Sequence, residues 1–389
     1  MNFMTTRHYL LALLTLTQLS YTTAITIERL TPPIINDTTF TKVTCDRPKR
    51  TSGITTRVDI IDGKTIINCH GHGGSGYVAL FGSVNEAVAH FMATNHDIGS
   101  PVRVIGSGVI GLTMALELYA RGFTNISIST KQIHDIPSWR AGGFFDPGTG
   151  KEKTDQEKYF LTLALSTFET YRTIEQGAHP YLTSSTVRRL PLYCRGDIES
   201  GVEILETLGY MPASEKVTLD FGNGVTHENF VKYYTYFIDI TLLMQQLWAH
   251  VRACNIPVVI EEITSLAQCA EPIICNCAGI ASGTFTADSA MFPSRGHFFM
   301  LNAGAGTEHM NYSIFTEVTQ NGKTEYVYLF PKNALVTAHN PTGDECRGML
   351  GGTFCLHTNR LSTEESTALD QREFDKLSER TQQFFYGKK

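Results

Sequence analysis

The residues whose spacing points most clearly to chemistry are Gly106, Gly108 and Gly111, which form the pattern Gly-x-Gly-x-x-Gly. An apolar run, Val102 to Ile105, precedes them and a periodic stretch, Leu112 to Arg121, follows, so we expect a strand, a tight turn and a helix. Glycine-rich turns also occur for backbone reasons alone. With a strand and a helix on either side, the pattern favours a dinucleotide site whose pyrophosphate meets the N–H groups at the helix N-terminus.

The strand after this helix lacks one expected residue. In dinucleotide-binding folds it ends in an acid that binds the ribose hydroxyls. Here the run from Asn125 ends in Ser129, Thr130 and Lys131. Ser129 or Thr130 could bind the ribose, or Lys131 could meet a phosphate, and these alternatives stay open.

A second glycine cluster lies upstream, where a strand runs into His70-Gly-His-Gly-Gly-Ser-Gly76 and a helix should begin near Tyr77. Its backbone donors at a helix start suit an anionic or strongly accepting ring edge. We interpret His70 and His72 as polar loop residues rather than metal ligands, and we predict no metal site. Two such loops would suit a ligand that has both a pyrophosphate and a flavin ring.

The elements that must position these loops alternate between short apolar runs and longer periodic stretches. The predicted strands include Lys64 to Cys69, Val102 to Ile105 and Ile273 to Cys277, and the clearest helices are Leu112 to Arg121, Gln156 to Glu175, Ile238 to Cys254 and Ser362 to Phe385. This order predicts an α/β fold with a mostly parallel sheet and helices on both faces. Aromatic and β-branched residues between about 180 and 240, and between 285 and 355, predict a second, largely antiparallel β domain.

Composition excludes several classes of protein. Charged residues make up 18% of the 389 residues, and 38 acids against 32 bases leave a net charge of −6 with no basic footprint for nucleic acid. The nine cysteines show no zinc spacing, and we assign no disulfides. The sequence does not indicate an oligomeric state.

Residues 1–24 have the pattern of a secretory signal peptide. Arg7 precedes an apolar run, Leu10 to Leu19, and small residues end at Ala24. The run is shorter than the roughly 20 residues that a membrane span needs. We therefore expect cleavage after Ala24, a secreted or periplasmic protein and no stable membrane span after cleavage.

Several segments together resemble the D-amino-acid oxidase family of FAD enzymes. The matching segments are VIGSGVIGLTMALEL, WRAGGFFDP at 139–147, IICNCAGIASG at 273–283, PSRGHFFML at 293–301 with His297 in place of Gln, and EYVYLFPK followed by MLGGTF. The resemblance implies an FAD-binding Rossmann-like domain with an interleaved, mainly antiparallel β substrate domain. It also implies oxidation of a small amino acid by hydride transfer to flavin, with molecular oxygen as the acceptor and an imino or keto acid, ammonia and hydrogen peroxide as products.

The resemblance also assigns roles to individual residues. Arg47 would bind the substrate carboxylate and Tyr328 would help to hold the substrate, while the family's other hairpin tyrosine falls on Thr324. We expect Tyr326 on the opposite strand face. The implied FAD-binding residues are Gly106, Gly108, Val109, Ile110, Gly111, Ser129, Thr130, Ala141, Gly142, Gly143, Gly73, Gly74, Gly76 and Val78.

The motifs occur in an order that predicts a circular permutation. In the family an Arg-Pro motif and a His-Gly-Gly-x-Gly segment close the chain, whereas here Arg47-Pro48 and His72 to Gly76 precede the dinucleotide loop. Joining the original chain ends and opening new ones elsewhere costs little stability when the original ends lie close together. The predicted boundaries are 1–24 for the signal peptide, 25–155 for the FAD-binding domain (the displaced segment 40–92, then the Rossmann unit 101–150), 156–240 and 291–360 for the substrate domain, 241–290 for the FAD-domain return and 361–389 for a C-terminal helix.

Three alternatives remain at this point. Thr324, His297 and the missing ribose acid would also fit a catalytically weakened FAD-binding protein of the same fold. A glycine- or sarcosine-type amine oxidase would use the same framework. A nicotinamide dehydrogenase would use only the first glycine loop and would leave the second unexplained.

Overall fold

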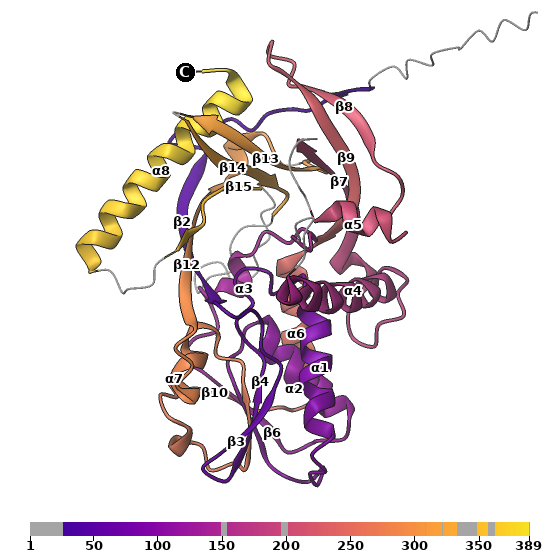
Figure 1. Cartoon of the computed structure of the whole chain (residues 1–389), viewed down its shortest axis with the longest axis vertical. Coiled ribbons are helices and arrows are strands. Elements are labelled where there is room, and N and C mark those ends of the chain that lie inside the picture. The colour runs from indigo at the N-terminus through magenta and orange to yellow at the C-terminus, as the bar shows by residue number, and fades with distance from the viewer. Residues whose placement is uncertain are drawn as a thin grey trace, which may run out of the picture.

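The structure is a computed structural model, and it describes residues 26–148, 154–195, 201–307, 309–320, 322–332, 348–356 and 362–388. The predicted signal peptide lies outside the described residues. Two sheets follow one another along the long axis of the molecule (Figure 1). Within the described ranges no helix is long and apolar enough to cross a bilayer.

The lower sheet in Figure 1 has the strand order β10-β6-β5-β11-β4-β3. Its strands are β3 (Val58–Ile61), β4 (Lys64–Asn68), β5 (Val102–Ile105), β6 (Ile126–Thr130), β10 (Val258–Ile260) and β11 (Ile273–Asn276). All neighbours are parallel except β3 and β4. The mostly parallel sheet predicted from the short apolar runs is confirmed.

Long helices cover one face of this sheet. They are α1 (Leu80–Met92), α2 (Val109–Ala120) and α6 (Ile240–Ala253), whose apolar side chains share the main core with Val104 and Ile128. Ile105 and Ile274 point to the other face, where the turn Leu266–Gln268 and the short helix α7 (Ser282–Thr286) cover them. The prediction of helices on both faces therefore holds for long helices on one face only, and the second face carries a short helix and a turn. Residues 261–272, which cross that face, are too few for a long helix and its turns.

The upper sheet contains ten described strands, ordered β1-β8-β9-β7-β13-β14-β15-β12-β16, with β2 paired to β12. Its strands are β1 (Thr26–Arg29), β2 (Phe40–Arg50), β7 (Val187–Arg195), β8 (Glu215–Asp220), β9 (Thr226–Ile238), β12 (Met291–Leu301), β13 (Ser313–Gln320), β14 (Lys323–Phe330), β15 (Met349–Gly351) and β16 (Cys355–Leu356). Only the pairs β1–β8 and β7–β13 among them are parallel. The largely antiparallel second domain is confirmed.

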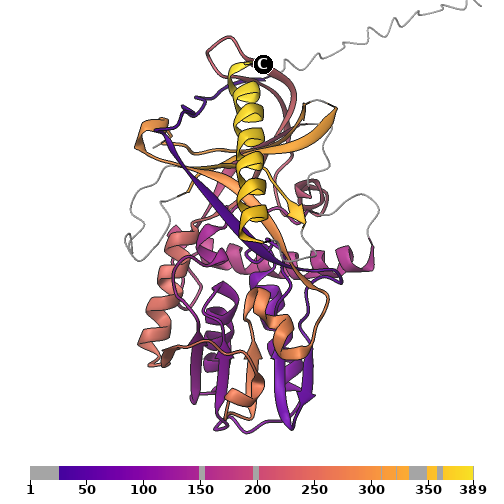
Figure 2. The same ribbon diagram turned by 90° about the vertical axis from the view of Figure 1, so that its left-hand side faces the viewer.

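Helix α8 (Thr363–Tyr386) lies across the strands of the upper sheet (Figure 2). A capping box between Ser362 and Glu365 starts it, and Gly387 in the left-handed conformation ends it. Its apolar stripe, including Phe374 and Leu377, packs on Val327 and Leu329 of β14 in a second core. The remaining helices are α3 (Pro137–Arg140), α4 (Asp155–Glu175) and α5 (Val202–Thr207).

The segment before the dinucleotide loop contributes to both sheets. β2 pairs with β12 along its full length of 11 residues, whereas β4 lies between β11 and β3 in the lower sheet. The predicted FAD-binding domain, 25–155, is therefore wrong in one respect, because β1 and β2 belong to the upper sheet. Strand pairing over such sequence distances depends on register, which composition does not reveal.

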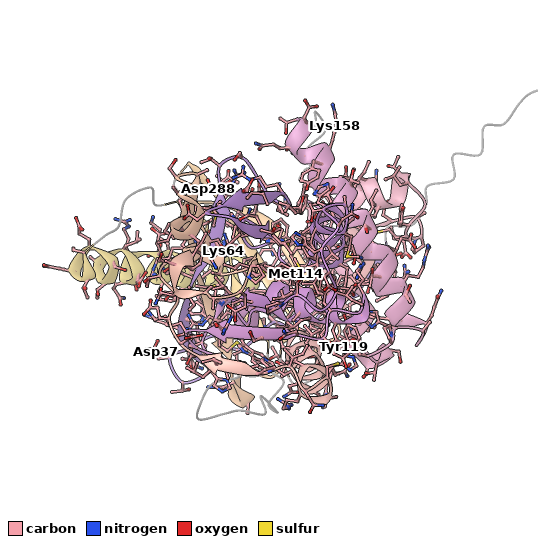
Figure 3. The ribbon with its side chains drawn as sticks, turned by 90° about the horizontal axis from the view of Figure 1, so that it is seen from below. Asp37, Lys64, Met114, Tyr119, Lys158 and Asp288 are labelled. Carbon is pink, nitrogen blue, oxygen red and sulfur yellow. The ribbon has the colours of Figure 1, made fainter. Side chains whose placement is uncertain are left out.

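The first described residues and the C-terminal helix lie at the same end of the molecule (Figure 1). Tyr386 Oη donates to the carbonyl oxygen of Pro33 at 2.8 Å, and Gln382 Nε2 donates to that of Ile35 at 2.8 Å. The view from below places buried Met114 of α2 centrally and Lys158 of α4 at the periphery (Figure 3). Residues 33–35 and the C-terminal part of α8 therefore lie in contact at the end of the molecule opposite the lower sheet.

The eight cysteines in the described part of the chain form no disulfide bonds with one another. Cys69, Cys275 and Cys277 are buried in or beside β4 and β11, as expected for small apolar core residues.

Candidate active site

The dinucleotide loop folds as the sequence predicts, between β5 and α2. Gly106 has φ +109°, and a Cβ there would lie 2.5 Å from the carbonyl oxygen of Cys277. A Cβ on Gly111 would collide with the carbonyl oxygen of Gly106. Gly108 is the N-cap of α2, so the loop and the helix N-terminus form a backbone cradle that suits an anion.

One donor of this cradle already has an acceptor. The backbone N–H of Val109 donates to Ser138 Oγ at 3.0 Å, and Ile110 is the next helical residue. A phosphate oxygen could accept the same N–H, so the Ser138 hydroxyl marks one donor of the cradle. Sequence reasoning did not identify Ser138, because α3 lies about 30 residues further along the chain.

The second glycine loop packs directly on β2. Gly73 and Gly74 have φ of +60° and +105°, and a Cβ on Gly74 would lie 2.8 Å from Cδ of Arg47. A Cβ on Gly76 would meet nothing closer than 3.9 Å. Gly73 and Gly74 thus adopt a left-handed backbone against the side chains of Lys49 and Arg47, whereas Gly76 is the position where a neighbouring ligand could require the absence of a side chain.

The helix after this loop starts later than predicted. α1 begins at Leu80 rather than near Tyr77, because Tyr77 and Val78 turn into the core. Tyr77 Oη donates to the carbonyl oxygen of Ser138 at 2.9 Å, which joins the two glycine loops. The buried Val78 therefore lies beside the junction of both loops.

The two loop histidines, His70 and His72, are buried. His72 Nε2 is 2.9 Å from Ser83 Oγ, and burial lowers its pKa to about 3. Burial also lowers the pKa of His70 to about 4, and its Nδ1 has no hydrogen-bond partner in the described part of the chain. Both rings are therefore neutral near pH 7.

The turn Ala141 to Gly143 joins the two sheets. A Cβ on Gly142 would lie 2.8 Å from Cδ2 of Phe330, and Gly143 has φ +82°. Lys332 Nζ donates to the carbonyl oxygen of Ala141 at 2.7 Å. Lys332 is buried, and burial lowers its pKa to about 8. Lys332 lies two residues beyond β14, and nothing in its local sequence marks it as a partner of this turn.

Arg47 lies in the middle of β2 and faces the end of β15. Its Nη2 donates to the carbonyl oxygen of Thr353 at 3.2 Å, and the guanidinium lies 4.4 Å from the Phe354 ring centre. A Cβ on Gly296 would collide with Nη2. Nη1 is buried without a partner, and none of the ion pairs of the described residues includes Arg47. Such a guanidinium suits a bidentate carboxylate.

Tyr328 is the tyrosine that the structure brings to Arg47. It is buried and packs against Phe330, with ring centres 4.8 Å apart. Burial raises its pKa, whereas the nearby Arg47 guanidinium lowers it. A Cβ on Gly351 would overlap the tyrosine ring, so the glycine leaves room for it.

The expected placement of Tyr326 is wrong. Val327 and Leu329 face α8, so Tyr326 lies on the same strand face as Tyr328, as the two-residue period of a strand requires. Tyr326 stacks on Phe315 at 5.3 Å. Thr324 lies at the exposed end of the hairpin, 3.1 Å from Thr319, and does not join this cluster.

The two candidates for the ribose contact, Ser129 and Thr130, lie on opposite faces of the lower sheet. Ser129 Oγ donates to Glu261 Oε1 at 2.6 Å and accepts from Arg103 at 2.7 Å, on the sheet face away from α2. Thr130 accepts from Ser107 of the glycine loop at 2.8 Å. Lys131 pairs with Glu262 at 2.8 Å. Thr130 therefore lies nearest the pyrophosphate cradle, and the ribose contact stays a prediction for that residue.

Comparison with known proteins identifies the family. The model of the family described as DAO, FAD dependent oxidoreductase, matches residues 102–388. The chain belongs to this family. The paired glycine loops fit the FAD that the family's description names. Arg47 and the second glycine loop precede the matched residues, so their roles stay predictions.

Several solved structures match part of the chain at low identity. Amadoriase I from Aspergillus fumigatus, a fructosyl amine:oxygen oxidoreductase, is 13% identical with TM-score 0.42, and the match covers 66% of this chain and 63% of that one. Amadoriase II from Aspergillus fumigatus in complex with FSA is 13% identical with TM-score 0.43, covering 73% and 74%. L-amino acid deaminase from Proteus vulgaris with its specific insertion deleted is 13% identical with TM-score 0.40, covering 72% and 75%. No curated protein sequence matched.

Proposed function

We propose that this member of the DAO family oxidises a small free α-amino acid, preferably of the D configuration, with molecular oxygen as the final acceptor. The observation that carries the proposal is the buried Nη1 of Arg47, which lies near Tyr328 and has no hydrogen-bond partner among the described residues. Arg47 is half-buried, and a guanidinium N–H that is shielded from water without an acceptor is costly, so the site favours a ligand that supplies a carboxylate. The bound flavin would accept the hydride from the α-carbon.

The residues of the chain then have separate tasks. Arg47 would hold the carboxylate in a fork of two N–H donors, with Phe354 limiting its tilt. Tyr328 would orient the substrate from β14. The amino group loses a proton and the α-carbon loses a hydride, which gives an imino acid. Water then releases a keto acid and ammonia, while oxygen takes up the two electrons and becomes hydrogen peroxide.

The test uses the purified chain from Ile25 onward. The expected protein is yellow, and anaerobic addition of a D-amino acid should bleach its visible flavin band, with peroxide formed on readmission of oxygen. A panel of D-, L- and N-methyl amino acids and glycine distinguishes this activity from a sarcosine-type oxidase. Bound FAD without bleaching by any of these compounds would instead support the catalytically weakened alternative.

Arg47→Ala should raise the substrate KM about a hundredfold, because truncating one partner of a buried charge pair costs roughly 3 kcal/mol. Arg57→Ala is the matched control, since Arg57 precedes β3 and forms an exposed pair with Asp59 at 2.8 Å. Arg47→Lys should recover only part of the affinity, because an ammonium has no planar fork. An unchanged KM in Arg47→Ala would disprove carboxylate binding at this residue.

We also propose that the protein is exported, on the pattern of residues 1–24. Expression of the full chain in a secreting host should give extracellular or periplasmic protein whose N-terminal residue is Ile25. Retention of Met1 on a fully intracellular product would contradict this proposal.

A further inference from the structure

Thr353, whose carbonyl oxygen accepts from Arg47, is itself held by His297 of β12. The backbone N–H of His297 donates to Thr353 Oγ1 at 2.6 Å, and the ring Nδ1 lies 2.8 Å from the same oxygen. His297 is fully buried and Thr353 is 5% exposed. The two contacts fix the start of the segment 353–354 against β12.

The other ring nitrogen of His297 meets a carboxylate from α8. Nε2 lies 2.8 Å from Asp370 Oδ1, and Arg295 holds the same carboxylate through Nε and Nη2, each at 2.8 Å. Arg295 also binds Asp46 of β2 at 2.9 Å. The ring packs edge-on against Phe374, with centres 5.1 Å apart. These hydrogen bonds therefore hold the Asp370 carboxylate in one orientation toward His297.

These contacts select one arrangement of protons. A carboxylate accepts, so Nε2 carries the hydrogen and Nδ1 is left as an acceptor. The Thr353 hydroxyl donates to Nδ1, and its oxygen accepts the backbone N–H of His297. The charged groups that face the ring are Asp370 and Glu373 from α8 and Arg295 from β12, and burial, the largest influence, holds the pKa of His297 below its usual value. The neutral ring thus satisfies every donor and acceptor.

The same segment supports Arg47 on two sides. Nη2 donates to the Thr353 carbonyl oxygen at 3.2 Å, and the Phe354 ring lies 4.4 Å from the guanidinium carbon. A shift of residues 353–354 would therefore move the guanidinium away from Tyr328. Since Gly296 leaves no space for a side chain beneath Nη2, the arginine has little freedom to compensate.

We propose that His297 is a positioning residue which, with Asp370, holds residues 353–354 so that Nη1 of Arg47 faces the substrate carboxylate. The inference rests on the proposed function, because it concerns the same carboxylate site. Glutamine, the residue that the family resemblance places at 297, can donate from its amide nitrogen to Asp370 and accept from Thr353 at its oxygen. Methionine is of similar size and can do neither.

The experiment compares flavin-bound wild-type protein with His297→Gln, His297→Met, Thr353→Val and Arg47→Ala. Benzoate, a carboxylate that has no amine to oxidise, is titrated while the flavin spectrum is followed, and KM and kcat are measured with the best amino acid. His297→Met and Thr353→Val should weaken benzoate binding and raise KM about tenfold, the effect of losing one buried hydrogen-bond network, with kcat changed less than about twofold. His297→Gln should stay within about twofold of wild type.

The pH dependence gives a second readout. Protonation would place a hydrogen on Nδ1 and deprive the Thr353 hydroxyl of its acceptor. Because the pKa of His297 is held below its usual value, the affinity of the wild type for benzoate should fall relative to that of His297→Gln, which does not titrate, only at pH values below about 6.5. If His297→Met does not fold, Thr353→Val and this comparison still decide the question.

The outcomes separate the two proposals. Equal benzoate binding by wild type and Arg47→Ala would overturn the proposed function. Loss of binding in Arg47→Ala with unchanged binding in His297→Met and Thr353→Val would overturn the positioning role alone. A parallel loss of kcat and of bound flavin in His297→Met, without recovery in His297→Gln, would also overturn it.

Discussion

The ammonium of Lys332 donates a 2.7 Å hydrogen bond to the carbonyl oxygen of Ala141, and this contact joins the end of β14 to the glycine turn that the family resemblance places at the flavin. Lys332 is 3% exposed. Burial lowers its pKa to about 8, while Asp239 acts in the opposite direction. Burying a charged amine costs free energy, and the hydrogen bond to the Ala141 carbonyl oxygen offsets part of that cost.

Lys332→Met should change the pH dependence of stability in a defined direction. The pKa of Lys332 is lowered in the folded state, so the unfolded chain binds more protons between about pH 8 and its ordinary value of 10.5. The free energy of unfolding of the wild type should therefore rise relative to that of Lys332→Met across this window. Urea denaturation at fixed FAD concentration measures the difference, and a difference that is flat or falls with pH would contradict the burial of a charged amine.

Gly76→Ala should separate cofactor binding from folding. A Cβ at this position meets nothing closer than 3.9 Å, so the free energy of unfolding of the apoprotein should change by less than about 0.5 kcal/mol. If FAD packs against Gly76, the added methyl should weaken FAD binding by about tenfold or more, as overpacking does. Gly99→Ala is the control in an exposed turn. Unaltered FAD affinity would place the flavin elsewhere.

Tyr328→Phe should reduce kcat/KM by about tenfold, because it removes one hydrogen bond to the substrate and leaves the ring stacked on Phe330. Thr324→Ala, at the exposed end of the same hairpin, should leave kcat/KM unchanged. Steady-state kinetics with equal flavin content in both variants checks this. Equal activity of Tyr328→Phe and wild type would remove Tyr328 from the site.

The circular permutation stays a prediction, and relinking the chain tests it. A chain of residues 101–386, a Gly-Ser linker of about six residues and residues 33–97 should fold and bind FAD, because Tyr386 already contacts Pro33 at 2.8 Å and a flexible linker of that length can join such neighbours. The same linker with new ends opened between Phe298 and Phe299 should fail, since that cut breaks β12 where it pairs with β2. FAD binding and cooperative unfolding are the measurements, and equal failure of both chains would count against the permutation.

Part of the site could be predicted from local sequence. The loop at Gly106, the adjoining β5 and α2, and the parallel sheet follow from backbone sterics and apolar periodicity, which act over a few residues. The same reasoning failed for Tyr326, although the two-residue period of a strand was sufficient to place it beside Tyr328. It also left Ser129 and Thr130 as equivalents, since the face of the sheet that each occupies follows only from strand register.

The sequence by itself therefore determined the cofactor loops, the alternation of elements and the resemblance to the DAO family, because glycine conformation and apolar spacing are local properties. Only the tertiary structure decided that Arg47 has a buried N–H near Tyr328 with no partner among the described residues. It also decided that Lys332 holds the turn at Ala141 and that His297 and Asp370 hold Thr353. Such contacts join residues up to about 300 positions apart. Their geometry depends on the pairing of β2 with β12 and the packing of α8 on the sheet, which no local pattern specifies.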